Sequence, residues 1–343
     1  MTVNADVHPI NLINHPIEVI HREDGTQLVR PIEPLAEFPT SMVDRLEKWA
    51  TETPDTVMIA QRHPDGHWLE VTYGDAYKQV KSIAQWMLDL RVDGEPLSQE
   101  RPLAVLSGNS TEHLLLALAA MYIGVPYAPI SEPYSTVSTD YGKLRHIFEN
   151  LTPGLVFAGN LGPFVDAINA VSPESVPVVS VESAHAKEDL KSPLTDWATL
   201  IGTEVTDAID AARAKVTGDT IAKFLFTSGS TGMPKGVINT QQMICSNQQI
   251  LLQTFAFLAE RPPVLLEWLP WNHTFGGNQN VGIVIYNGGS LYLDEGKPTP
   301  KLLHKTVENL ADVSPTIYFN VPKGFELLVH ELKKNEEVAA KFF

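Results

Sequence analysis

The chain has 343 residues, of which 43% are hydrophobic and 19% charged, a composition typical of packed globular proteins and not of disordered ones. Its formal net charge of -16 argues against a general surface for nucleic acid or anionic membranes, so we expect no nucleic-acid partner. The single cysteine, Cys245, excludes an intrachain disulfide.

The amino terminus, MTVNADVHPINLINHP, lacks the basic head and the apolar core of a secretory signal peptide. The longest apolar stretch, LLLALAAMYIGVPYAPI, is interrupted by Gly124, Pro126 and Pro129, which predicts a buried helix followed by a strand and no membrane span. Residues 1–38 are polar and irregular, and we expect them to form an extension over the surface. These features together predict a cytoplasmic protein.

Helix and strand patterns alternate through the first half of the chain. Thr72 is placed to cap a helix whose apolar residues recur at helical spacing. A buried strand, LAVLS, is followed by Asn109 and Glu112, which predict a capping box for a helix that ends near Gly124. The next segments predict a strand (VPYAPI), a helix (KLRHIFENL) and two strands (GLVFAG and PVVSV).

The same alternation continues through the second half. The strand IAKFLF leads into a loop rich in glycine and serine, after which Ile244, Leu251, Phe255 and Leu258 mark one face of a helix. The segments VLLEWL, SLYL and TIYFN predict strands, and the last segment, VPKGFELLVHELKKNEEVAAKFF, predicts a helix.

This order of elements predicts an α/β fold with two stacked, mostly parallel sheets flanked by helices, because parallel strands need right-handed helical crossovers. We expect an N-terminal extension over 1–38, a first α/β subdomain over 39–215 and a second, incomplete one over 216–343.

The segment KFLFTSGSTGMPKGVINT predicts an anion site. In our interpretation a strand runs into a glycine-rich turn and then a helix, so that backbone N–H groups point into the turn. Gly229 and Gly232 allow close approach of a ligand, and Lys235 adds a positive charge. The residues with hydroxyl donors are Thr227, Ser228, Ser230 and Thr231. A solvated surface turn is the alternative, since glycine, serine and proline are common in turns.

Other loop signatures fail. The nucleoside-triphosphatase pattern requires glycine where Pro234 stands and serine or threonine where Gly236 stands. The dinucleotide pattern is absent, and neither Ser228, Ser230 nor Ser110 lies in a nucleophile elbow.

The motif TSGSTGMPKG resembles the phosphate loop of the adenylate-forming enzymes, namely acyl-CoA synthetases, luciferases and adenylation domains. The resemblance runs from about residue 38 to the end and includes VTYGDAYKQVKSIAQWM and LAVLSGNSTEHLLLALAAMYIGVPYAPI. The segments LEWLPWNHTFGGNQNVGIVIYNGGSLYLD and SPTIYFNVPKGFELL are similar in particular to the feruloyl-CoA synthase branch.

The resemblance implies a two-step ligase. A carboxylic acid, here ferulate or a related hydroxycinnamate, attacks ATP to give an acyl-adenylate and pyrophosphate, and coenzyme A then displaces AMP. It implies that residues 227–235 cradle the β- and γ-phosphates, that Lys235 and His273 are catalytic, and that Thr231 contacts Mg²⁺.

The resemblance also implies an acyl site. Its expected residues are Trp271, His273, Thr274, Phe275, Gly276, Gly277, Asn278, Asn320, Val321, Pro322 and Lys323. A neutral imidazole at His273 can donate to a carboxylate oxygen, and the glycines leave room for a flat ring. His273 satisfied by backbone, and Lys323 as a solvated helix-start residue, are the alternatives. We take no histidine pair to have metal-ligand spacing.

Several family motifs are not found in order. These are the Tyr-Gly-x-Thr-Glu motif with its magnesium glutamate, the Thr-Gly-Asp with its ribose aspartate, and a small C-terminal domain with a lysine. The chain therefore looks like the amino-terminal portion of such an enzyme, truncated before its barrel part, and we expect it alone to be inactive. The alternatives are a naturally short, noncatalytic nucleotide- or acyl-binding or interaction protein, and a synthetase for another aromatic or medium-chain fatty acid.

Overall fold

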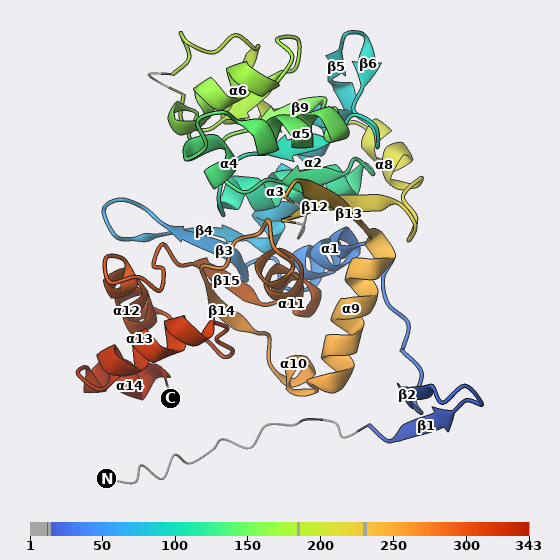
Figure 1. Cartoon of the computed structure of the whole chain (residues 1–343), viewed down its shortest axis with the longest axis vertical. Helices are drawn as coiled ribbons and strands as arrows, with labels where there is room; N and C mark the ends of the chain where they lie inside the picture. The colour runs from blue at the N-terminus through green and yellow to red at the C-terminus, as the bar shows by residue number, and fades with distance from the viewer. Residues whose placement is uncertain (1–11, 13–14, 184–185, 229–231, 343) are drawn as a thin grey trace.

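The computed structural model describes residues 12, 15–183, 186–228 and 232–342, without the side chain of Ser228. It contains two separate sheets, each with helices against both faces (Figure 1). Most neighbouring strands in both sheets are parallel. The predicted α/β fold with two mostly parallel sheets flanked by helices is confirmed.

The first sheet is seven-stranded, in the order β11-β10-β9-β7-β8-β12-β13. Only the β12–β13 pair in this sheet is antiparallel. Its strands are β7 (Leu103–Val105), β8 (Tyr127–Pro129), β9 (Leu155–Phe157), β10 (Val178–Ser180), β11 (Leu194–Asp196), β12 (Ile221–Ser228) and β13 (Pro234–Thr240). Antiparallel neighbours can be joined by a tight turn, which is why the short connection 229–233 suffices between β12 and β13.

The second sheet is four-stranded, in the order β14-β15-β3-β4, and ends in an antiparallel pair. Its strands are β3 (Val57–Arg62), β4 (Trp68–Thr72), β14 (Val264–Glu267) and β15 (Ser290–Leu293). Both sheets thus combine strands from before and after residue 215. Sheet membership does not follow the expected boundary near that residue, and the division into subdomains stays a prediction.

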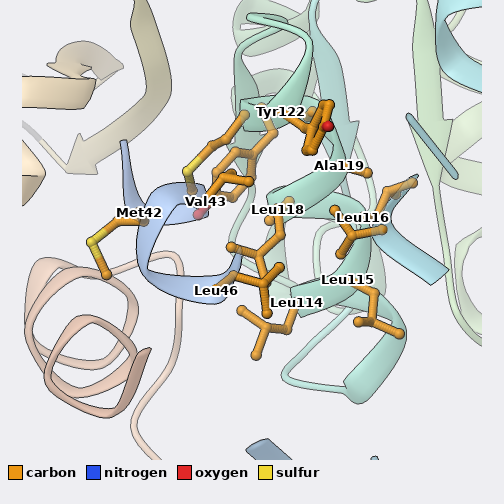
Figure 2. Packing of buried hydrophobic residues seen from close by; sticks show 14 of the residues in the cluster. Met42, Val43, Leu46, Leu114, Leu115, Leu116, Leu118, Ala119 and Tyr122 are labelled. Atoms are coloured by element: carbon orange, nitrogen blue, oxygen red, sulfur yellow. The ribbon is translucent and has the colours of Figure 1, made fainter. Parts of the chain in front are cut away.

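The helices between the two sheets form the main core. They are α1 (Met42–Glu52), α2 (Tyr73–Asp89), α3 (Thr111–Tyr122), α9 (Gln241–Thr254) and α11 (Val281–Asn287). Figure 2 shows α1 lying against α3, with Leu46 beside Leu114 and Leu118. All three leucines are buried, and burying one such side chain contributes about 1.5–3 kcal/mol. The predicted Thr72 cap of α2 is confirmed, because its side chain accepts a hydrogen bond from Asp75 N–H.

Other helices cover the outer faces of the sheets. The outer face of the first sheet packs on α5 (Gly142–Leu151) and α6 (Val165–Val171), and that of the second on α12 (Leu303–Asp312), α13 (Pro322–Leu332) and α14 (Glu336–Phe342). The short helices are α4 (Pro133–Thr136), α7 (Trp197–Ile201), α8 (Ala208–Arg213) and α10 (Phe257–Glu260), with a 3₁₀ turn at Gly162–Phe164 and a π-helix, η2, at Phe275–Asn280. In the described parts of the chain, every helix is too short or too polar to cross a bilayer.

Two small hairpins complete the structure. They are β1–β2 (Ile17–His21 and Gln27–Pro31) and β5–β6 (Arg91–Val92 and Glu95–Pro96). The first of them lies in the segment 1–38, which we expected to be irregular. The pairing of β1 with β2 gives this segment regular structure, and the hairpin stands apart from the two sheets (Figure 1).

The predicted cap at Asn109 is wrong by one residue. Ser110 caps α3, and its Oγ accepts from His113 N–H at 3.1 Å. The Asn109 side chain is engaged elsewhere, donating to Leu269 O at 2.9 Å and accepting from Trp271 N–H at 3.1 Å. Asn109 therefore ties the start of α3 to the segment after β14.

The predicted strand TIYFN does not form. Thr316 N–H donates to Val264 O at 2.9 Å, but the next contact, from Ile317, is at 3.5 Å to the same carbonyl, so no ladder with β14 develops. The helix predicted for the last segment is divided into α13 and α14. The helix predicted around Ile244 to Leu258 likewise ends at Thr254, before the separate α10.

Candidate functional site

The glycine-rich loop joins two antiparallel strands. Thr227 pairs with Lys235 and Ser228 with Pro234, and β13 continues to Thr240, which caps α9. The prediction that a helix follows the loop directly is therefore wrong. The start of α9 lies a whole strand away, about 20 Å along β13. Its dipole cannot reach an anion in the loop, so the loop N–H groups and Lys235 must supply the positive field.

The described part of the loop retains two predicted features. Gly232 has φ +102°, a conformation that residues with a side chain rarely adopt. The side chain of Lys235 is exposed and has no hydrogen-bond or ion-pair partner among the described residues, so its charge is available to a ligand. The predicted phosphate residues Gly229, Ser230 and Thr231, the last also the predicted magnesium contact, lie outside the described residues.

A cavity of about 420 Å³ lies between β13, α9 and η2. Of the predicted substrate residues, Thr274, Phe275 and Asn278 line it. The lining residues that sequence reasoning missed are Asn239, Met243, Ile244, Asn247, Gln248 and Gln279. The amide-rich run NTQQMICSNQQ could have indicated these residues in the sequence, because it places several amides on α9, the helix that follows β13.

Three side chains hold the π-helix in place. Lys223 Nζ donates to Gly277 O at 3.0 Å, and Gln248 Nε2 donates to Asn278 O at 3.0 Å. The Asn278 side chain in turn donates to Asn239 Oδ1 at 2.9 Å. Lys223 and Asn239 are register partners on β12 and β13. The hairpin that carries the loop is therefore bonded directly to the wall of the cavity.

Lys223 is an unusual residue in this position, because it is only 1% exposed. Its ammonium lies 5.3 Å from the centre of the Tyr127 ring and close to the buried ring of His113. Burial lowers the pKa of Lys223 to about 7, so near neutral pH the amine is present in both its charged and its neutral form. A lysine inside the otherwise apolar strand IAKFLF was the signal for it in the sequence.

The two glycines of η2, Gly276 and Gly277, lie too close to neighbouring backbone atoms to carry a side chain. A Cβ on Gly276 would lie 2.5 Å from Leu269 O, and one on Gly277 would lie 2.1 Å from Trp271 O. The absence of a Cβ at both positions therefore allows the π-helix to pack onto the segment after β14, and the expectation that these glycines leave room for a flat substrate ring stays a prediction.

His273 is exposed at the start of this segment. Its Nδ1 accepts a hydrogen bond from Phe275 N–H at 3.3 Å. That contact requires an unprotonated Nδ1, so in the neutral ring the proton is on Nε2. The local backbone bond and a ligand-facing role are therefore compatible, because Nε2–H remains available to donate to a carboxylate.

Trp271 does not line the 420 Å³ cavity. It lines a second cavity, of about 320 Å³, together with Asn109 and His113, whose ring centre lies 5.0 Å from that of the indole. Burial lowers the pKa of His113 to about 4, so this histidine is neutral at pH 7. Trp271 and the group Thr274, Phe275 and Asn278 therefore line different cavities.

The predicted residues at the start of α13 also lie outside the 420 Å³ cavity. Asn320 accepts from Trp268 Nε1 at 3.3 Å and donates to Tyr318 Oη at 3.0 Å. Val321 and Pro322 begin the helix, and Lys323 is paired in solvent with Glu326 at 2.9 Å. The neighbouring Phe319, which the sequence did not indicate, contacts this wall because its ring lies 5.6 Å from that of Phe275.

Glu267 joins the end of β14 to η2. It is 2% exposed and accepts hydrogen bonds from Leu269 N–H and from the Asn280 side chain. Burial raises the pKa of Glu267 to about 8, so most of this carboxyl group is protonated at pH 7. The hydrogen bonds from Leu269 and Asn280 to Glu267 fix both ends of the segment between Glu267 and Asn280, which includes His273.

Comparisons with known proteins agree on one family. The protein-family model described as AMP-binding enzyme matches residues 46–342. A long-chain-fatty-acid–CoA ligase of Mycobacterium bovis is 25% identical over 84% of this chain and 45% of its own length. A carboxylic acid reductase of Mycobacterium marinum is 22% identical over 78% of this chain and 23% of its own length.

A solved structure shares the fold of this chain. The crystal structure of a fatty acyl-adenylate ligase from L. pneumophila, in complex with acyl adenylate and pyrophosphate, superposes with a TM-score of 0.56 at 20% identity. The match covers 80% of this chain and 42% of that one. The chain thus spans less than half the length of each of these proteins.

Proposed function

Because the chain belongs to the AMP-binding enzyme family, we propose that it acts in the reaction of an ATP-dependent acid–thiol ligase. In this proposal ATP activates an aromatic carboxylic acid, ferulate or a related hydroxycinnamate, as its acyl-adenylate. Coenzyme A then takes the acyl group. The predicted cytoplasmic location stays a prediction from the sequence.

The adenylation step makes clear demands on the residues. A carboxylate oxygen attacks the α-phosphorus of ATP, and the bond to the β-phosphate oxygen breaks, so that negative charge develops on pyrophosphate. Donors that face this charge lower the barrier. Lys235 and the hydroxyl of Thr227 stand at the base of the loop for this purpose, and His273 Nε2–H can orient the attacking carboxylate.

One observation carries the proposal: the hairpin that carries the predicted phosphate loop is also bonded to the wall of the cavity. Lys235 and Thr227 pair at its loop end, while Lys223 and Asn239 pair four residues further along and bond to η2. Four strand residues span about 13 Å. The hairpin thus supports binding of the triphosphate at one end and of the acid at the other.

The cavity supports a compact, partly polar acid. Its volume of about 420 Å³ falls within the range of roughly 300–1,000 Å³ for small-molecule sites. Phe275 offers a ring face, while the amides of Asn247 and Gln279 offer partners for hydroxyl or methoxy groups on a ring. A long alkyl chain would leave these amides without partners.

Magnesium does not fit the loop residues alone. Mg²⁺ is usually held by one or two carboxylates together with phosphate oxygens. The loop 227–235 contains no aspartate or glutamate, and its one assigned hydroxyl contact, Thr231, lies outside the described residues. In the proposed adenylation step Lys235 and Thr227 would stabilise the developing charge and His273 would orient the carboxylate, while carboxylate ligands for Mg²⁺ would have to come from outside the loop 227–235.

The proposal is tested by calorimetry on the 343-residue chain. We expect ATP to bind the parent and Lys191→Ala, a surface control that removes the same charge, with equal affinity, and Lys235→Ala more weakly. In the presence of ATP, ferulate should bind and octanoate should not. Equal ATP affinity in all three proteins would refute the role of the loop, and preferential binding of octanoate would refute the substrate class.

A further inference from the structure

The turn between β3 and β4 brings three potential metal ligands together. Its sequence is HPDGH, from His63 to His67, and it projects from the body of the molecule at the outer end of the β3–β4 hairpin (Figure 1). His63 N–H donates to His67 O at 2.9 Å, and Gly66 N–H donates to His63 O at 2.9 Å. These bonds close the turn and bring both imidazoles to Asp65.

The side chains converge on one point. His63 Nδ1 lies 2.9 Å from Asp65 Oδ1, and His67 Nδ1 contacts the same oxygen. The two rings are stacked, with their centres 4.7 Å apart. All three ligand atoms lie within 4.8 Å of one another. Facing lone pairs repel each other unless a proton or a metal ion lies between them.

The base of the hairpin is already fixed without a metal. Arg62 donates to Asn309 Oδ1 at 2.8 Å, forms an ion pair with Asp312 and stacks over Trp68 at 4.1 Å. Arg62 also donates to Gly66 O at 2.5 Å. The turn is therefore held against α12, and a metal would bind ligands whose backbone is already in place.

The donor set indicates the metal. Two imidazole nitrogens and one carboxylate oxygen are typical zinc ligands, whereas Ca²⁺ and Mg²⁺ take oxygen ligands. A hydrogen bond from His63 holds the pKa of Asp65 below its usual range, so the carboxylate is ionised at neutral pH. The three side chains are 43%, 59% and 57% exposed, which leaves an entry path and open positions for water.

We propose that His63, Asp65 and His67 form a zinc-binding turn, independent of the adenylation chemistry. The expectation that no histidine pair has ligand spacing is wrong, because HPDGH places two histidines at a spacing of H-x₃-H. A bound zinc ion would replace the two hydrogen bonds to Asp65 and clamp β3 to β4 at the edge of the second sheet.

The test is a calorimetric titration of the 343-residue chain with zinc chloride at pH 7.5. We expect one zinc ion to bind per chain and not to be displaced by excess magnesium or calcium. His63→Ala and His67→Ala should each weaken binding by about tenfold or more, since even loss of an outer-sphere partner costs 10–100-fold. His330→Ala, an exposed histidine on α13, is the matched control and should bind as the parent does.

A second arm lowers the pH to 5.5. Protons compete with the metal for the ligand atoms, so the affinity should fall there. All variants must share the unfolding midpoint of the parent without metal, which shows that the turn substitutions leave the fold intact. Absence of saturable zinc binding by the parent, or equal binding by parent, His63→Ala and His67→Ala, would overturn the proposal.

Discussion

The buried lysine on β12 predicts a pH-dependent stability of defined sign. The pKa of Lys223 is about 7 in the folded protein and 10.5 in the unfolded chain, because burial disfavours the ammonium. Between these values the unfolded chain binds more protons than the folded one, so this group makes stability rise with pH. Below pH 7 both states are protonated and the contribution is constant.

The magnitude follows from the same two values. Between pH 7 and pH 9 the contribution of Lys223 to the free energy of unfolding should rise by about 2 kcal/mol. Lys223→Met removes the titrating group. It also removes the donor to Gly277 O, and leaving that carbonyl unpaired costs about 1–3 kcal/mol at every pH.

The assay is urea unfolding of the parent and Lys223→Met at pH 6, 7, 8 and 9, followed by both tryptophan fluorescence and circular dichroism. The difference in unfolding free energy between the two proteins cancels the titration of all other groups. It should be flat from pH 6 to 7 and grow in favour of the parent above pH 7. The exposed control Lys191→Met should show no such trend. A difference that stays constant to pH 9 would refute the burial of the amine and the reasoning built on it.

Three further outcomes are expected. Above the unfolded pKa of Glu267 the folded parent holds a proton that the unfolded chain has lost, so the free energy of unfolding of the parent falls as pH rises. The variant Glu267→Gln lacks this loss and should gain about 2–3 kcal/mol of stability relative to the parent between pH 5 and 7. Unfolding curves showing no gain would contradict this. Gly277→Ala should strongly lower the midpoint of thermal unfolding, since its Cβ would clash with Trp271 O. The control Gly142→Ala, whose Cβ would make only ordinary van der Waals contacts, should not lower it. Similar unfolding midpoints for both variants would be inconsistent with the packing of η2. Lys235→Ala should lower ATP affinity by about 1.5–3 kcal/mol in calorimetry, the worth of a charge-assisted hydrogen bond, and an unchanged affinity would exclude the contact.

Local patterns predicted much of the fold. The Thr72 cap and the apolar spacing of α2 are encoded within one segment, and the alternation of strands and helices is enough to indicate parallel sheets. The strand β13 was missed because its pairing depends on the register between Thr227 and Lys235, which periodicity does not reveal. TIYFN has the composition of a strand but lacks a partner that continues beyond Val264.

Some residues of the candidate site could likewise be predicted from the sequence, and others could not. Thr274, Phe275 and Asn278 were expected from the motif and line one cavity, but the resemblance carried no information about the amides of α9. Lys223 was overlooked because lysine is almost never fully buried. The reason for Gly277 could not be found in the sequence, since the clash partner, Trp271 O, comes close only in the folded chain.

The bond between Lys223 and Gly277 O makes the β12–β13 hairpin a thermodynamic link. If a phosphate ligand at Lys235 shifts the hairpin, the Gly277 carbonyl and the cavity wall must follow or lose their donor. Any such coupling is reciprocal: the factor by which nucleotide changes the affinity for the acid equals the factor by which the acid changes the affinity for nucleotide. Cooperativity between the two ligands would then be carried by the bonds of Lys223 and Asn239 to η2.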